Sequence, residues 1–458
     1  MSEAAAPARP ALARTALALL PIQIGLRGAE VAWPLLLATW FGHTQATDVY
    51  FMCAAAYVLA SALLAGAFQD SALTPVLLSV VRHSPLQLPR VAGAVLGHTV
   101  AGAAIVATAT GVLAEAGVAL FGSGSLRLAL TLVPAFSLCL IAAAVRGFYV
   151  GVFNAHGSFA AHPMASGVGM AATIAVVVVA RSRAGIAVVP LAQLGGECCA
   201  VLLLAMMARK NLRLDIALSL DRSEPVRRLF ALLRYEVVGN ATTRINPVVD
   251  QLMASLSPIA GAGTILRYTA DVASLPNSLL QATLFPALLS RLSLEKAAGL
   301  REEFRATVVR ALRWVCAVLA VTSAALVALR RPLLRLLFLH GAMDAKGIRC
   351  MADLAPYAFM DVPPFGALLV LARAHVALQN GRIMFRIGIL NAALNALFDL
   401  ALYPVLGLRG ILLATSLMHA AIAGVLWIRL RSLLISARSW DASRARASAA
   451  RAACNLPR

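Results

Sequence analysis

Long hydrophobic runs constrain the fold of this chain more than any other feature. A helix needs about 20 mostly apolar residues to cross a bilayer, and runs of this kind recur between polar or basic breaks. They predict an all-α polytopic membrane protein with about 12 transmembrane helices. The predicted spans are residues 14–40, 48–69, 91–114, 128–153, 159–180, 185–208, 229–256, 261–289, 306–329, 350–377, 383–405 and 409–430.

The composition agrees with a membrane protein. Hydrophobic residues make up 60% of the chain and charged residues only 13%, whereas soluble domains carry about 25% charged residues. Lys and Arg number 40, against 20 Asp and Glu. In a membrane protein this excess indicates basic cytoplasmic loops in contact with membrane lipid, and no nucleic-acid-binding motif accompanies it. The positions of the basic loops predict that both termini are cytoplasmic.

A basic segment near the middle divides the chain into two halves. We predict an N-terminal lobe at 1–208, a cytoplasmic linker at 209–228, a C-terminal lobe at 229–435 and a basic cytoplasmic tail at 436–458. A weak repeat supports two pseudo-symmetric six-helix lobes, because Pro75-Val-Leu-Leu-Ser79 in the first half matches Pro286-Ala-Leu-Leu-Ser290 in the second. Repeats of this kind place a transport site at the interface between them.

Charged side chains interrupt the first, seventh and eighth predicted spans. A central ionisable residue costs roughly 3 kcal/mol on insertion scales, so these side chains are expected to face protein or a water-filled cavity. They are either polar pairs that serve packing alone or the wall of a pathway for an anionic substrate. The predicted substrate-binding residues are Arg27, Arg244, Arg267 and Asp271. Glu30 lies three residues after Arg27, so the two can pair on one helix face.

A cation site is the second prediction, in the C-terminal half. Asn395 and Asp399 are four residues apart and share one helix face. Thr415 lies on the next predicted span, and Asp250 is the intramembrane acid of the seventh. Two carboxylates, an amide oxygen and a hydroxyl are hard oxygen donors that suit Na⁺ or a shared proton. The alternative is an Asn–Asp hydrogen bond that serves packing.

Motifs of catalysis and nucleotide binding are absent from the sequence. There is no P-loop, no hydrolase triad and no phosphotransfer constellation. The seven cysteines lack the spacing of metal ligands. We therefore expect neither an enzyme nor an ATP-driven pump, and no cofactor other than a coupling Na⁺ or H⁺.

Several short motifs occur in a fixed order along the chain. Val-Val-Asp-x-x-x-Ala-Ser-Leu at 248–256 is followed by Leu-x-Tyr-x-Ala-Asp at 266–271, and a Phe-Gly-to-Asp segment at 41–48 lies in the first half. In this order and spacing the motifs resemble the MurJ/MviN lipid II flippases, a family of the multidrug/oligosaccharidyl-lipid/polysaccharide exporter superfamily. The resemblance implies a flippase of the bacterial inner membrane that carries a lipid-linked anionic precursor by alternating access. We expect a monomer.

The chain departs from this family where arginines line the cargo cavity. Of the first-span pair only Arg27 is present, and Trp33 occupies the second position. Ser61, Ala62 and Val272 stand where the family has further arginines. The chain also has about 12 predicted spans, fewer than the fourteen typical of the family. These differences leave two alternatives: a cation-coupled exporter of a small molecule, such as a secondary metabolite, and a membrane scaffold that has lost its substrate site.

Overall fold

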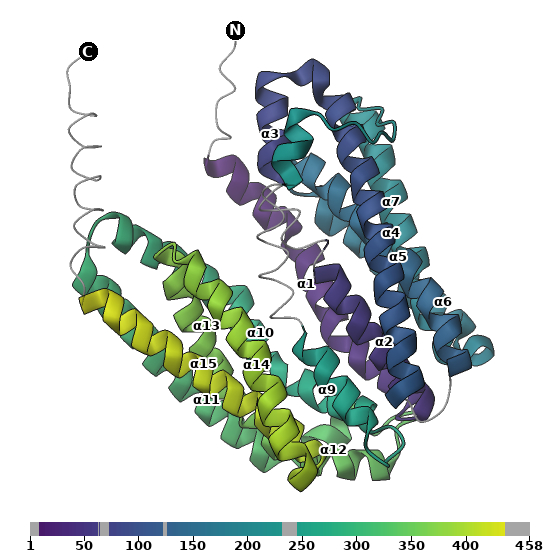
Figure 1. Ribbon diagram of the computed structural model, residues 1–458, viewed down its shortest axis with the longest axis vertical. Coiled ribbons are helices and arrows are strands. Elements are labelled where there is room, and N and C mark those ends of the chain that lie inside the picture. Colours follow the sequence, from purple (N-terminus) through teal and green to yellow (C-terminus); the bar gives the residue numbers. More distant parts are fainter. Residues whose placement is uncertain (1–8, 63, 65–72, 122–125, 231–244, 436–458) are drawn as a thin grey trace. The chain divides into compact units, whose positions relative to one another are not determined.

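The computed structural model in Figure 1 describes residues 9–62, 64, 73–121, 126–230 and 245–435. In these ranges the regular elements are α-helices with short 3₁₀ and π turns, and no described residue forms a strand. The predicted all-α fold is therefore confirmed. The helices group into two compact units, Met1–Leu256 and Ser257–Arg458.

Eight α-helices of the first unit fall within the described residues. They are α1 (Arg9–Phe41), α2 (Gln45–Ser61), α3 (Thr74–His83), α4 (Leu88–Phe121), α5 (Leu126–Ala155), α6 (Ala161–Ala184), α7 (Val188–Leu212) and α9 (Asn246–Ser255). The core of this unit includes the buried aromatic side chains Phe148 and Phe153 on α5. α5 packs against α2, α4 and α7 and so lies at the centre of the unit.

The segment at 41–48 forms the turn between α1 and α2. Gly42 adopts a φ of 63°, which a glycine reaches without steric cost. Thr44 caps α2, because its hydroxyl accepts a hydrogen bond from the N–H of Thr47 at 3.2 Å. The hydroxyl of Thr47 in turn accepts from the N–H of Thr44 at 2.7 Å. This reciprocal capping box satisfies two backbone donors at the start of α2.

The segment 213–222, inside the predicted linker, lies against α4. Ser219 donates its N–H to the carbonyl of Gly93 at 3.1 Å. A Cβ at Gly93 would collide with the carbonyl of Ala217, and a Cβ at Gly97 with that of Ser219. Two glycines one helical turn apart therefore let this extended segment approach the helix backbone closely. Leu214 is also buried in the core beside α3, α4 and α5.

The second unit contains α10 (Ala262–Ala297), α11 (Arg301–Phe338), α12 (Ala345–Phe359), α13 (Val362–Ala377), α14 (Gly381–Leu406) and α15 (Leu408–Ile435). Its core lies among α10, α11, α13 and α15 and includes Phe285, Phe304 and Leu426, all fully buried. α12 and α13 meet at a bend of 40°. Pro363 and Pro364 lie in the first turn of α13. Neither has a backbone N–H to donate to the preceding turn, so the helix breaks between α12 and α13.

Several described helices meet the requirements of membrane spans. Seven helical stretches are long and apolar enough to cross a bilayer, or eight if the bent pair α12–α13 counts as one span. One of these stretches, 161–212, is a hairpin whose helices α6 and α7 pack against each other, so it supplies two crossings. A multi-pass membrane protein is therefore confirmed, whereas the number of about 12 spans stays a prediction.

The division into compact units falls later in the chain than the predicted second lobe begins. α9 packs against α2 and α4 inside the first unit, which ends at Leu256. Residues 231–244, which follow the predicted linker, and the predicted tail at 436–458 lie outside the described residues. The lobe limits 1–208 and 229–435 therefore remain a prediction.

Candidate functional site

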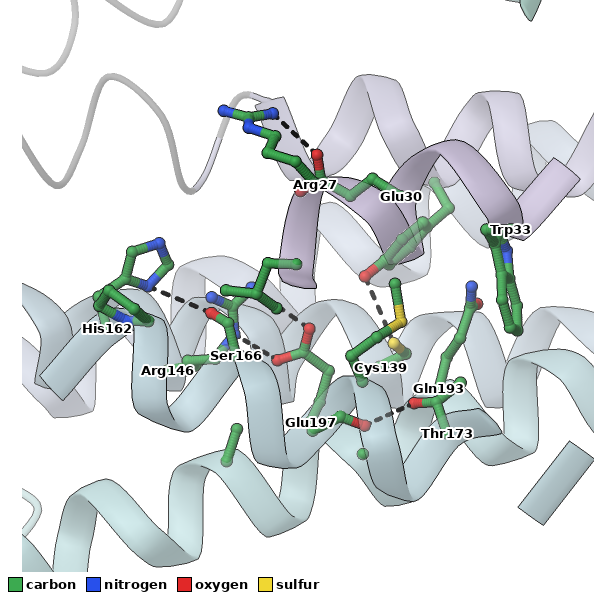
Figure 2. Close-up of a pocket in the computed structure, with 17 residues that line it drawn as sticks. Arg27, Glu30, Trp33, Cys139, Arg146, His162, Ser166, Thr173, Gln193 and Glu197 are labelled. Atoms are coloured by element: carbon green, nitrogen blue, oxygen red, sulfur yellow. Dashed lines mark hydrogen bonds and ion pairs between the residues drawn. The ribbon is translucent and has the colours of Figure 1, made fainter. Parts of the chain in front are cut away.

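A polar pocket of about 440 Å³ lies within the first unit, among α1, α2, α5, α6 and α7. Figure 2 shows it with α1 on one side and α5, α6 and α7 on the other. Its wall carries ionisable, amide and aromatic side chains on five helices, which is unusual for a hydrocarbon-spanning bundle. The lining includes Arg27, Glu30, Trp33, Tyr57, Cys139, Arg146, His162, Ser166, Thr173, Gln193 and Glu197.

Small residues bring α6 and α7 together beside the pocket. A Cβ at Gly196 would collide with the hydroxyl of Thr173 and the carbonyl of Gly169. Thr173 itself donates to the carbonyl of Gly169 at 2.9 Å and reaches that of Ala192 at 3.3 Å. Close backbone contact through small residues is the usual way in which membrane helices associate. This contact fixes the part of α7 that carries Gln193 and Glu197.

Arg146 and Glu197 form a bidentate ion pair across the pocket wall. The Nε of Arg146 lies 2.6 Å from one carboxylate oxygen of Glu197, and its Nη2 lies 3.3 Å from the other. Only 23% of the Arg146 side chain and 20% of the Glu197 side chain are exposed. Planar, two-point pairing of this kind fixes both side chains and both helices, α5 and α7.

A second ion pair lies on α1, where Arg27 Nη1 contacts Glu30 Oε2 at 2.8 Å. This pair is far more exposed, at 70% for Arg27 and 55% for Glu30. Figure 2 shows the two pairs on opposite sides of the pocket region. The predicted i,i+3 pairing of Arg27 with Glu30 is confirmed. The formal charges of these four side chains cancel, so the pocket is polar without a strong excess of either sign.

The inner wall combines aromatic rings with hydrogen-bonding groups. The hydroxyl of Tyr57 lies 3.3 Å from the Sγ of Cys139. The Oε1 atom of Gln193 is buried and has no hydrogen-bond partner. In Figure 2 the amide of Gln193 extends from α7 toward the side of the pocket where Trp33 lies. A buried acceptor without a partner costs about 1–3 kcal/mol, so this atom favours a ligand or water that donates a hydrogen bond.

The other predicted substrate-binding residues are placed as follows. Arg267 and Asp271 form an i,i+4 ion pair on α10, with 3.0 Å between Nε and Oδ1. They belong to the second unit, whereas Arg27 belongs to the first. Arg244 lies outside the described residues. The role of these residues in binding cargo stays a prediction.

Of the four residues predicted to form a cation site, three lie in the second unit: Asn395, Asp399 and Thr415. Asn395 donates its amide N–H to Asp399 at 2.8 Å, and both side chains are fully buried on α14. Thr415 donates its hydroxyl to the carbonyl of Ile411 on its own helix at 3.1 Å. Asp250 lies on α9 in the first unit. In the part of the chain that the structure describes, no group of three or more His, Cys, Asp or Glu side chains could hold a metal. The site, and coupling to Na⁺ or H⁺, remain predictions.

The pocket itself was not predicted as a unit from the sequence. Glu197 and Arg146 each interrupt an apolar run, and this is the signal that could have identified the pair. Gln193 and Tyr57 carry no comparable signal, because uncharged polar residues are common in membrane helices. Their role depends on which helices lie side by side.

Comparisons of the sequence with known proteins indicate one family. A family model described as Lipid II flippase MurJ matches residues 37–454. A protein of Rhizobium tropici described as a probable lipid II flippase MurJ is 25% identical over 224 residues, which are 49% of this chain and 40% of that protein. The match therefore spans less than half of the relative's length.

Solved structures extend the comparison over nearly the whole chain. A lipid II flippase MurJ in an inward closed conformation matches with a TM-score of 0.75 at 17% identity, covering 96% of this chain and 94% of the other. An inward-facing multidrug resistance MATE family transporter of the MOP superfamily gives 0.69 at 13% identity, covering 89% and 94%. An outward-facing one gives 0.60 at 11% identity, covering 90% and 93%. At these identities the likeness concerns the fold.

Proposed function

Because the chain belongs to the lipid II flippase MurJ family, we propose that it moves a lipid-linked anionic precursor of the cell envelope across the bacterial inner membrane. The precursor is lipid II-like or an exopolysaccharide intermediate. The family match over residues 37–454 carries the proposal. A membrane transporter fits this family better than an enzyme, and the helical, apolar fold agrees with a multi-pass membrane protein.

Alternating access is the mechanism that we propose for this movement. The MATE transporters that share the fold are described in both inward-facing and outward-facing conformations. Two compact units of helices suit such a mechanism, because each can move as a body while the cargo site changes the side to which it opens. Without a nucleotide-binding motif, energy comes from an ion gradient, the membrane potential or the cargo's own gradient.

Two of the arginines predicted to bind the anionic group of the cargo are not isolated cations. Arg27 pairs with Glu30 and Arg267 with Asp271, both on the same helix as their partner. The Arg27–Glu30 pair is exposed, and exposed pairs contribute about 0–1 kcal/mol, so a phosphate group that binds Arg27 in two-point geometry can displace the carboxylate of Glu30. The near-neutral pocket favours a second candidate function, export of a small molecule by the same mechanism.

Rescue of cells depleted of their own lipid II flippase tests whether lipid II is the cargo. We expect weak rescue or none, because Trp33 and Val272 stand where the family has arginines. Trp33→Arg and Val272→Arg together are expected to raise rescue if the lost cations are the reason. Colony counts, with matched amounts of protein in the membrane, provide the measurement. Full rescue by the unchanged chain would contradict our emphasis on these positions and would establish lipid II as cargo.

Asp399→Asn tests coupling to a cation. The substitution keeps the size of the side chain and the hydrogen-bonding position beside Asn395, but it removes the charge that would hold Na⁺ or a proton. In membrane vesicles with an imposed Na⁺ or pH gradient, cargo movement should lose its dependence on that gradient. Asp353→Asn, on an exposed side of α12, is the matched control and should keep it. Unchanged dependence in Asp399→Asn would leave the Asn395–Asp399 hydrogen bond with a packing role only.

A further inference from the structure

We propose that the pocket in the first unit binds an uncharged saccharide, the sugar portion of the lipid-linked cargo. This inference rests on the proposed function and names the part of the cargo that enters the pocket. A monosaccharide or disaccharide presents many hydroxyl groups, each able to donate and accept, and an apolar C–H face. The pocket offers a partner for each of these features.

The charges of the pocket favour a neutral polar ligand. Arg146 and Glu197 use two contacts on each other, and Arg27 contacts Glu30. An isolated anion or cation inside the pocket would have to compete with a partner already in place. A hydroxyl group has no such conflict, because it can accept from a guanidinium and donate to a carboxylate without separating the pair.

Two uncharged groups on the inner wall point to the same ligand class. The buried Oε1 of Gln193 lacks a donor, and a sugar hydroxyl or acetamido N–H would supply one. Trp33 lines the same pocket from α1, and an indole ring provides a large flat apolar surface for the C–H face of a sugar ring. Figure 2 shows both side chains at the same end of the pocket. Stacking at one face and hydrogen bonds at the edge would orient the ring.

The size of the pocket suits a small organic molecule. Its volume of about 440 Å³ lies within the range of about 300–1,000 Å³ typical of pockets for small organic molecules. Arg27, 70% exposed on α1, belongs to the same lining. We therefore expect a phosphate attached to the sugar to contact Arg27 while the sugar lies inside the pocket. The phosphate and the sugar of the cargo then contact different side chains.

Equilibrium binding of radiolabelled chitobiose to the purified full chain in detergent tests the inference. We expect saturable binding that changes little between about 50 and 500 mM NaCl, since a neutral ligand is not subject to ionic screening. Trp33→Ala should weaken binding about tenfold through loss of the aromatic face, and Gln193→Leu about threefold to tenfold through loss of one acceptor. Trp33→Phe keeps an aromatic ring and should recover most of the affinity.

Trp314→Ala is the matched control, because Trp314 is 67% exposed on α11 in the second unit; it should bind like the unchanged chain. Thermal melting of each variant identifies loss of folding. Absence of chitobiose binding by the folded, unchanged chain would overturn the inference. So would Trp33-dependent binding of inorganic pyrophosphate or tetraethylammonium in place of chitobiose.

Together with a vesicle assay of cargo movement, the binding experiment separates this inference from the proposed function. Chitobiose binding without any movement of lipid-linked cargo in vesicles would retain the saccharide pocket and reject the flippase. Movement of lipid-linked cargo that Trp33→Ala leaves at full rate, together with absent chitobiose binding, would retain the flippase and reject the pocket.

Discussion

Replacing Glu197 by alanine is expected to lower the free energy of unfolding by about 3 kcal/mol, near the lower end of the range for breaking a buried ion pair. The reason is that Arg146 keeps its charge in a largely buried position, with 23% of its side chain exposed, and loses a carboxylate that it contacts at 2.6 Å. Unfolding of the purified protein in a graded mixture of mild detergent and SDS, followed by circular dichroism, provides the measurement.

Two variants show whether the buried position is the cause. Glu30→Ala breaks the exposed pair on α1 and is expected to change the free energy of unfolding by less than about 1 kcal/mol. Arg146→Met combined with Glu197→Leu removes both charges and is expected to recover most of the stability, because no uncompensated charge remains. A Glu197→Ala variant as stable as Glu30→Ala would show that Arg146 finds another partner or reaches solvent.

Replacing Gly196 by alanine is expected to cost about 2–3 kcal/mol, although only one methyl group is added. The new Cβ would collide with the carbonyl oxygen of Gly169 and the hydroxyl of Thr173, and a backbone oxygen cannot rotate away. α6 and α7 would have to separate, and the pocket wall carried by α7 would move with them. The same detergent unfolding series measures the loss of stability.

The adjacent Gly195 provides the matched control, since a Cβ at that position meets no atom within 4 Å. Gly195→Ala is expected to stabilise by about 0.5–1 kcal/mol, because alanine favours a helix more than glycine does. Equal losses at both glycines would contradict close contact of α6 with α7 at Gly196.

The fold could be predicted from the sequence because the bilayer imposes a length on each apolar run. Most predicted spans coincide with a described helix, and α10, predicted from residue 261, begins at Ala262. The short helix α3 was missed, because ten residues are too few to cross a bilayer and carry no membrane signal. The close approach of 213–222 to α4 was missed as well, since Gly93 and Gly97 allow it without indicating what approaches them.

The candidate site could be predicted only in part. Arg27 and Glu30 are three residues apart, so their pairing follows from helix geometry alone. Asn395 and Asp399 pair for the same reason, at four residues. Arg146 and Glu197 are 51 residues apart in the chain, and nothing in the sequence says that α5 and α7 are neighbours at that level. Contacts within one helix can be predicted from spacing, whereas contacts between helices require the packing.

The contact of residues 213–222 with α4 limits the length of free chain that follows α7. Residues 213–222 would reach roughly 33 Å if they were free, at about 3.3 Å per residue. Ser219 donates a hydrogen bond to Gly93, and its carbonyl lies directly against Gly97. Because these contacts hold the segment to α4, it adds little of its roughly 33 Å to a free connection. Gly93 and Gly97 on α4 therefore shorten the free connection between α7 and the residues that follow position 222.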